Sequence, residues 1–122
     1  MASKFKKLVN VTRTTVLADN ARLADSFVSR LVGLLTSPPL LPGQGLIIDP
    51  CSSVHMFGMS FPIDVIFFDK QWNVVGLEES LVPGRISKMY PSAKCCVELP
   101  AGTIADTTTR VGDRVEVTDL TA

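Results

Sequence analysis

The sequence contains little cysteine, with three thiols among its 122 residues. Small secreted domains that depend on disulfides carry more cysteines, and an even number of them. The odd, low count argues against a disulfide framework and favours reduced thiols in a reducing compartment. No apolar segment follows the basic residues near the start of the sequence, so we expect no signal peptide and predict a cytoplasmic protein.

The sequence also lacks an excess of charge and a long apolar run. Lys and Arg together number 12, as do Asp and Glu, whereas proteins that bind nucleic acids or anionic membranes carry a surplus of cations. The apolar run at residues 65–68 is far too short to cross a bilayer. We therefore expect no nucleic-acid partner and no membrane span.

The remaining composition is that of an ordinary globular protein. Hydrophobic residues make up 46% of the chain and charged residues 20%, which argues against intrinsic disorder. The length suits a single domain over residues 1–122, which would bury roughly two thirds of the surface of its unfolded chain.

Short apolar runs between turn residues predict a β-rich fold. Residues 8–17 are rich in Val and Thr, which favours one or two early strands. Residues 63–68 form the strongest run and predict a central strand, which a turn at residues 69–73 connects to the next strand. The other predicted strands are residues 45–48, 54–57, 74–77, 95–99 and 114–117.

One segment has helical periodicity instead. Between residues 21 and 35, apolar side chains including Phe27, Leu31 and Leu35 recur at helical spacing, and Pro38 and Pro39 end the pattern. This is the one convincing helix, and its apolar stripe needs a sheet to cover. The predicted fold class is α+β, mostly β: a small bent sheet or partial barrel with one packed α-helix.

Six motifs are spread along the chain: RLVGL (30–34), GL (45–46), CSSVHMFGMSFPID (51–64), FD (68–69), ELPAG (98–102) and GD (112–113). Together they resemble a known family of small bacterial and archaeal domains, the domain of unknown function 192. The resemblance covers nearly the whole chain and is most specific at residues 55–64. It implies a compact β fold with one packed helix, and it implies no assigned activity and no catalytic residues.

The only histidine, His55, lies in an unusual segment with Cys51, Met56 and Met59. Thiolate, imidazole and thioether groups together suit a soft metal such as Cu(I). Met and Phe at alternating positions also fit a buried core, and the chain offers no second histidine and no Cys-x-x-Cys pair. We therefore expect no cofactor, with Cys51, His55 and Met59 as the weak candidate metal ligands.

A hydrolase-like enzyme is a second interpretation of this segment. Cys51 would be the nucleophile, His55 its base and Asp64 the group that orients the base. This arrangement needs a turn between Cys51 and His55, and the sequence contains no recognisable oxyanion hole. We favour a protein without enzymatic activity.

Asp64 stands inside the most apolar strand, where a carboxylate needs hydrogen bonds or a charged partner. Its alternative partners are backbone N–H groups of the Phe61-Pro62 turn, Arg30 and His55. We predict that His55 and Asp64 are neighbours in space.

The loop at residues 83–92 carries Arg85 and Tyr90, which could form the rim of a site for an anion or a peptide; a solvated loop is the simpler interpretation. The sequence thus predicts a non-enzymatic binding or accessory module whose partner is a small molecule or a protein. The predicted ligand-binding residues are His55, Met59, Asp64, Arg85 and Tyr90.

Overall fold

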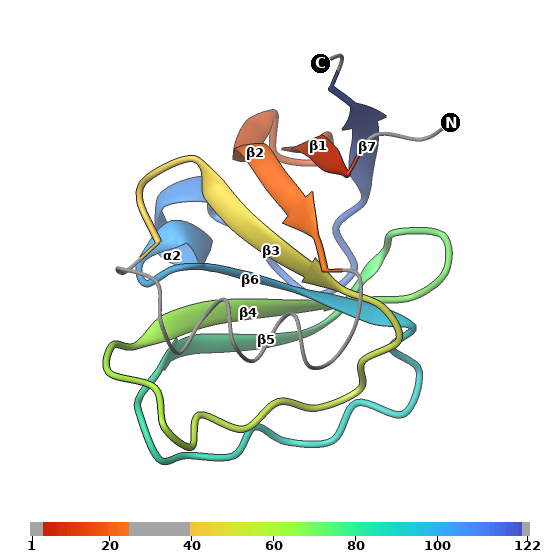
Figure 1. Cartoon of the computed structure of the whole chain (residues 1–122). Helices are drawn as coiled ribbons and strands as arrows, with labels where there is room; N and C mark the ends of the chain where they lie inside the picture. Colours follow the sequence, from red (N-terminus) through yellow and green to blue (C-terminus); the bar gives the residue numbers. More distant parts are fainter. Residues whose placement is uncertain (1–3, 25–39, 121–122) are drawn as a thin grey trace.

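A computed structural model describes residues 4–24 and 40–120 of the chain. Within those residues the chain forms seven strands and one short helix (Figure 1). Their bounds are β1 Phe5–Asn10, β2 Thr15–Leu23, β3 Gln44–Ile48, β4 Ile63–Phe68, β5 Val74–Leu81, β6 Cys95–Pro100, α2 Thr103–Thr107 and β7 Val115–Asp119.

The strands make one sheet in the order β5-β4-β6-β3-β2-β1-β7. Every neighbouring pair is antiparallel except β2 and β3, which are parallel. The sheet curls strongly, so that β1, β2 and β7 turn away from β4 and β5 (Figure 1). The α+β, mostly β prediction of a bent sheet is confirmed.

Apolar side chains pack on both faces of the sheet. Successive residues of a strand point to opposite faces, and β4, which is buried throughout, contributes to both. One cluster, the helix-side core, contains Ile66, Phe68 and Ile104 of α2. The other, the loop-side core, contains Val65, Phe67 and Met56. Burial on both faces explains why β4 is a continuous apolar run, although it lies second from the sheet edge and not at its centre.

The predicted helix over residues 21–35 is wrong at its start, because residues 21–23 belong to β2. There Ala21 pairs with Lys6 of β1 and with Gly45 of β3, and hydrogen bonding on both sides outweighs the local helical pattern. The remainder of that prediction, including the stripe of Phe27, Leu31 and Leu35, falls outside the described residues.

The described helix, α2, was not predicted, because five residues are too few to show a helical period. Most strand predictions are confirmed, and β7 pairs with β1 in a regular antiparallel register. Residues 54–57 do not form a strand; among the described residues their one β-bridge joins His55 to Ile86. No helix among the described residues is long and apolar enough to cross a membrane.

Candidate functional site

Two loops far apart in the sequence run side by side beneath the loop-side core (Figure 1). We call residues 52–57 and 84–90 together the loop ribbon. Hydrogen bonds between their backbones hold them in register, because each polar backbone group that leaves water needs a partner. The bonds run from the N–H of Met56 to the carbonyl of Arg85 (2.7 Å), from Gly84 to Met56 (2.9 Å), from Ser87 to Val54 (2.9 Å) and from Tyr90 to Ser52 (2.8 Å).

The ribbon has an inner and an outer face. Val54, Met56 and Ser87 are buried against the sheet, and the Ser87 hydroxyl accepts the N–H of Val54 at 2.9 Å. Alternation along an extended chain directs the residues between them outward. On that side His55 pairs with Ile86, and its ring stacks on Phe57 with the ring centroids 4.9 Å apart.

Large apolar side chains are exposed on and beside this outer face. Phe57 is 53% exposed, Ile86 63%, Met89 64% and Val82 45%. We call these four residues the exposed patch. Single exposed apolar residues are normal, but several that gather on one short ribbon mark an interaction surface.

The charges of the ribbon are mostly positive. Arg85 and Lys88 are exposed, and neither forms an ion pair with a described residue. The carboxylate of Glu78 is already engaged, because it accepts the hydroxyl of Tyr90 at 2.7 Å and the N–H of Lys88 at 3.1 Å. The patch is therefore bordered by cations.

Tyr90 anchors the ribbon to the sheet. Its ring stacks on Phe67 with a centroid distance of 4.4 Å and lies over Gly76, where a Cβ atom would come within 2.2 Å of the ring. Its hydroxyl also donates to the carbonyl of Leu77 at 3.2 Å. Burial and the hydrogen bond to Glu78 raise the pKa of Tyr90, so this side chain stays neutral and serves as an anchor.

Asp64 lies away from the ribbon. Its carboxylate is 1% exposed and accepts three backbone N–H groups, from Ser80 (2.8 Å), Gly102 (3.2 Å) and Ile104 (2.8 Å). Backbone N–H groups do bind Asp64, as one of the alternatives predicted, but they come from distant segments and not from the Phe61-Pro62 turn. Two of these donors belong to α2 and the residue before it, on the side of the helix-side core.

The predicted contact between His55 and Asp64 is wrong. Ile63 and Val65, which flank Asp64, face the loop-side core, so strand alternation directs Asp64 to the opposite face of the sheet. His55 follows Val54, which belongs to the loop-side core. The arrangement of Cys51, His55 and Asp64 that a hydrolase needs is therefore not assembled. Arg30, the other predicted partner, falls outside the described residues.

The three weak candidate metal ligands are engaged in different ways. The Cys51 thiol donates to the carbonyl of Ser53 at 3.2 Å, and Met59 packs against the loop-side core. His55 stacks on Phe57 on the outer face. Within residues 4–24 and 40–120, no three side chains of His, Cys, Asp or Glu come together as a metal site requires.

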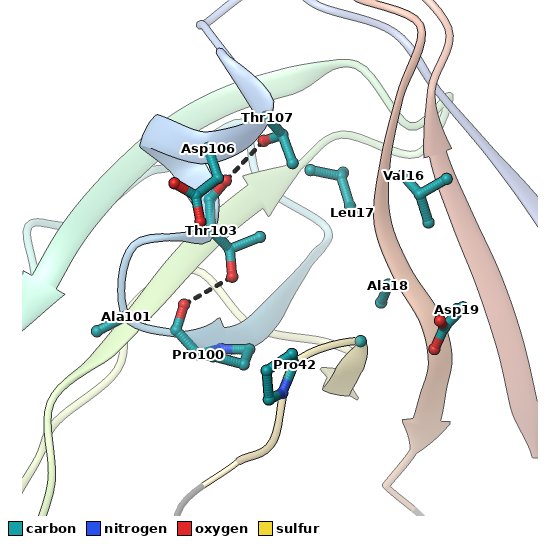
Figure 2. A pocket seen from close by; sticks show the side chains of 11 residues that line it. Val16, Leu17, Ala18, Asp19, Pro42, Pro100, Ala101, Thr103, Asp106 and Thr107 are labelled. Atoms are coloured by element: carbon teal, nitrogen blue, oxygen red, sulfur yellow. Dashed lines mark hydrogen bonds between the residues drawn. The ribbon is translucent and has the colours of Figure 1, made fainter.

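A separate cleft of about 350 Å³ lies between β2, the turn before β3 and α2 (Figure 2). Its polar side chains include Asp19 and Asp106, and none of the described residues that line it is a lysine or arginine. Gly43 closes one side with φ +85°, and a Cβ atom there would lie 2.5 Å from Asp19 Oδ1. The sequence does not reveal this cleft, because its lining comes from three distant segments and Pro42-Gly43 by itself indicates only a turn.

Comparison with solved structures identifies the fold. A "putative transcription regulator" of Sinorhizobium meliloti aligns with a TM-score of 0.79 and 24% identity over 95% of each chain. A protein of unknown function from Novosphingobium aromaticivorans aligns with a TM-score of 0.76 and 21% identity, over 92% of this chain and 83% of that chain.

Sequence relatives extend the likeness to archaea. A UPF0127 protein of Pyrococcus furiosus is 36% identical over 115 residues, which cover 89% of this chain and 96% of that protein. A UPF0127 protein of Thermococcus sibiricus is 32% identical over 116 residues, which cover 89% of this chain and 73% of that protein. The profile of the DUF192 family, described as Uncharacterized ACR, COG1430, matches residues 9–117, so the chain belongs to this family.

Proposed function

We propose that this domain is a non-enzymatic docking module that binds an acidic, apolar segment of a partner protein through the loop ribbon. The observation that carries the proposal is the exposed patch, in which Phe57, Val82, Ile86 and Met89 remain largely accessible on a surface with a fixed backbone. A cytoplasmic location belongs to the same proposal and is supported by the low, odd cysteine count.

The chemistry of the ribbon favours a protein segment as the occupant. Four large apolar side chains offer an area that another polypeptide could bury, which is the main source of free energy in association. Arg85 and Lys88 border this area and form no ion pair with a described residue, so acidic residues on the partner would complement them. Backbone bonds and the Tyr90 anchor hold the ribbon in place, which lowers the entropy lost on binding.

An enzymatic function has less support. Cys51 and His55 lie on the loop side of the sheet and Asp64 on the other, so Asp64 cannot orient His55 as a base for the thiol. Of the predicted ligand-binding residues, His55 lies opposite Ile86 in the ribbon, and the Arg85 carbonyl accepts the N–H of Met56. Met59 follows the ribbon in a turn in which its N–H donates to the carbonyl of Met56 at 3.2 Å. Tyr90 and Asp64 have structural roles in this proposal.

Selection of peptides from a random 12-residue library on the immobilised full chain would test the proposal. Enriched peptides should combine Asp or Glu with Leu, Ile or Phe, and each should bind Ile86→Ser at least tenfold more weakly than the unchanged protein. Val111→Ser is the matched control, because Val111 is also 63% exposed but lies in the turn before β7. Equal loss of binding in both variants, or enrichment of basic peptides, would contradict the proposal.

A further inference from the structure

Two thiols from distant parts of the chain meet beneath the start of the ribbon. The Sγ atoms of Cys51 and Cys96 lie 3.1 Å apart, although 45 residues separate them in sequence. Two backbone pairings build this contact: Ile48 lies opposite Cys96 in the β3–β6 ladder, and the N–H of Cys51 donates to the carbonyl of Lys94 at 3.0 Å. The contact thus follows from the sheet register, which fixes where both cysteines lie.

The two thiols differ in access. Cys96 is completely buried, whereas Cys51 is partly exposed, so a reagent from solvent meets Cys51 first. Cys95 faces the other way into the helix-side core, as strand alternation requires. Burial raises the pKa of the Cys95 thiol to about 12, so its reactive thiolate form is scarce at neutral pH.

We propose that Cys51 and Cys96 form a reversible disulfide by exchange with a low-molecular-weight disulfide. The Cys51 thiol first loses a proton, and its thiolate attacks one sulfur of the oxidant. A mixed disulfide bond forms between Cys51 Sγ and that sulfur, while the oxidant's own S–S bond breaks and releases one thiolate. Cys96 then loses its proton and attacks Cys51 Sγ, which forms the protein disulfide and releases the second thiolate. The protein loses two protons and two electrons in all, and the oxidant takes up both and leaves as two thiols.

The required movement is small. A disulfide bond is about 2.05 Å long, so the two sulfurs must approach by about 1 Å, which rotation of the Cys51 side chain on its loop can supply. The bond would close a loop of 45 residues and so restrict the unfolded chain, which predicts a rise of several degrees in Tm on oxidation.

The test is incubation of the folded full chain with oxidised glutathione, followed by alkylation and intact mass measurement. The expected product has lost two hydrogen atoms and has one alkylatable thiol after unfolding. Treatment with dithiothreitol restores the other two, which gives three in total. Cys95→Ala should form the same bond, which leaves no alkylatable thiol. Cys96→Ser should instead hold one glutathionyl group on Cys51.

Cys95 and Cys96 are adjacent and share any proteolytic peptide, so the single variants identify the partner of Cys51. Three alkylatable thiols after oxidation of the unchanged protein would overturn the proposal. A stable glutathione adduct on the unchanged protein, or a bond that Cys95→Ala abolishes, would also overturn it.

Discussion

The carboxylate of Asp64 fixes the relative positions of three segments of the fold. It extends from β4 and accepts N–H groups from Ser80 in β5, from Gly102 and from Ile104 in α2. Hydrogen bonds to an ionised group are stronger than those between neutral groups, and donors left without a partner in a buried site are costly. Asp64 therefore attaches a very short helix, which could not be stable by itself, to the sheet.

Asp64→Asn should lower the free energy of unfolding by about 2–4 kcal/mol. The amide keeps one acceptor oxygen but directs an NH₂ group at backbone donors, so at least one N–H loses its partner. Urea unfolding at pH 7 measures the loss. Asp106→Asn is the control, because Asp106 is exposed on α2 and its substitution should change stability by less than about 0.5 kcal/mol. A similar loss in both variants would refute a special role of Asp64.

The need of Asp64 for partners was predictable, because Ile63 and Val65 beside it mark an apolar strand. The identity of those partners was not, because its donors lie 16, 38 and 40 residues further along the chain. His55 was the preferred side-chain partner because it is near in sequence, but strand alternation sends the two groups to opposite faces of the sheet. The alternation of side chains along the strand, and not proximity in the sequence, therefore determines which groups can contact Asp64.

At the scale of elements, a buried polar cluster joins β1 to the turn before β7. Asp113 Oδ2 accepts hydrogen bonds from Asn10 Nδ2 (3.0 Å), Arg13 Nε (3.0 Å) and the Arg110 N–H (2.9 Å). Burial alone would raise the pKa of Asp113, but these hydrogen bonds outweigh it and hold the pKa below 3.8. The Gly112-Asp113 motif of the family therefore stabilises β7, the edge strand, as well as forming a turn.

The lowered pKa of Asp113 predicts a loss of stability in acid. Its stabilising contribution is fully present well above pH 3.8, the value in the unfolded chain, and is lost as the pH falls through the lower pKa of the folded protein. Asp113→Asn should cost about 2–3 kcal/mol at pH 7, and this difference from the unchanged protein should shrink below pH 3.

Urea unfolding at pH 7 and at pH 2.5 measures both effects. Glu116→Gln serves as the control, because Glu116 is an exposed carboxylate on β7 that takes no part in the cluster. A stability difference for Asp113→Asn that stays constant between the two pH values would contradict this account.

The strands were predictable where their burial determines the pattern of apolar residues in the sequence. β4 and β6 are buried on both faces, and all but one residue of each is apolar: Asp64 in β4 and Glu98 in β6. The β4–β5 turn carries Asp69, whose carboxylate accepts the N–H groups of Gln71 and Asn73 at 2.9 Å. The loop ribbon was not predictable as a unit, because it is held by backbone bonds and by a contact between Tyr90 and Gly76 that no local pattern encodes. Nothing in the sequence around Gly76 indicates that the ring of Tyr90 packs against it.

At the scale of the whole molecule, the sheet keeps three features apart. The loop ribbon lies on one face and α2 with its acidic cleft on the other, while the Cys51–Cys96 contact lies at the start of the ribbon. The bordering charges differ as well, since cations flank the exposed patch and carboxylates line the cleft. A balanced total charge therefore conceals local surfaces of opposite sign.

These local surfaces bear on whether the protein binds nucleic acid, a question that the name of the Sinorhizobium meliloti protein raises. At 24% identity that likeness establishes the fold alone. The exposed cations of the loop ribbon are Arg85 and Lys88, which could neutralise about two phosphates. Each neutralised phosphate contributes about −0.9 to the slope of log affinity against log salt, so the ribbon could support a slope of about −2 at most.

We therefore predict no binding of a fluorescein-labelled 30-base-pair duplex at 150 mM salt with protein at tens of micromolar, as measured by fluorescence anisotropy. Non-specific binders reach dissociation constants of about 10⁻⁴–10⁻⁶ M by neutralising many phosphates, which two cations beside an apolar patch cannot do. If weak binding is detected as the salt is lowered to 20 mM, the slope of log affinity against log salt should be no steeper than about −2. Arg85→Ser should make that slope less negative by about 1. Micromolar affinity at 150 mM salt with a steeper slope would require a larger basic surface than the loop ribbon provides, and would favour a nucleic-acid partner over the acidic protein segment.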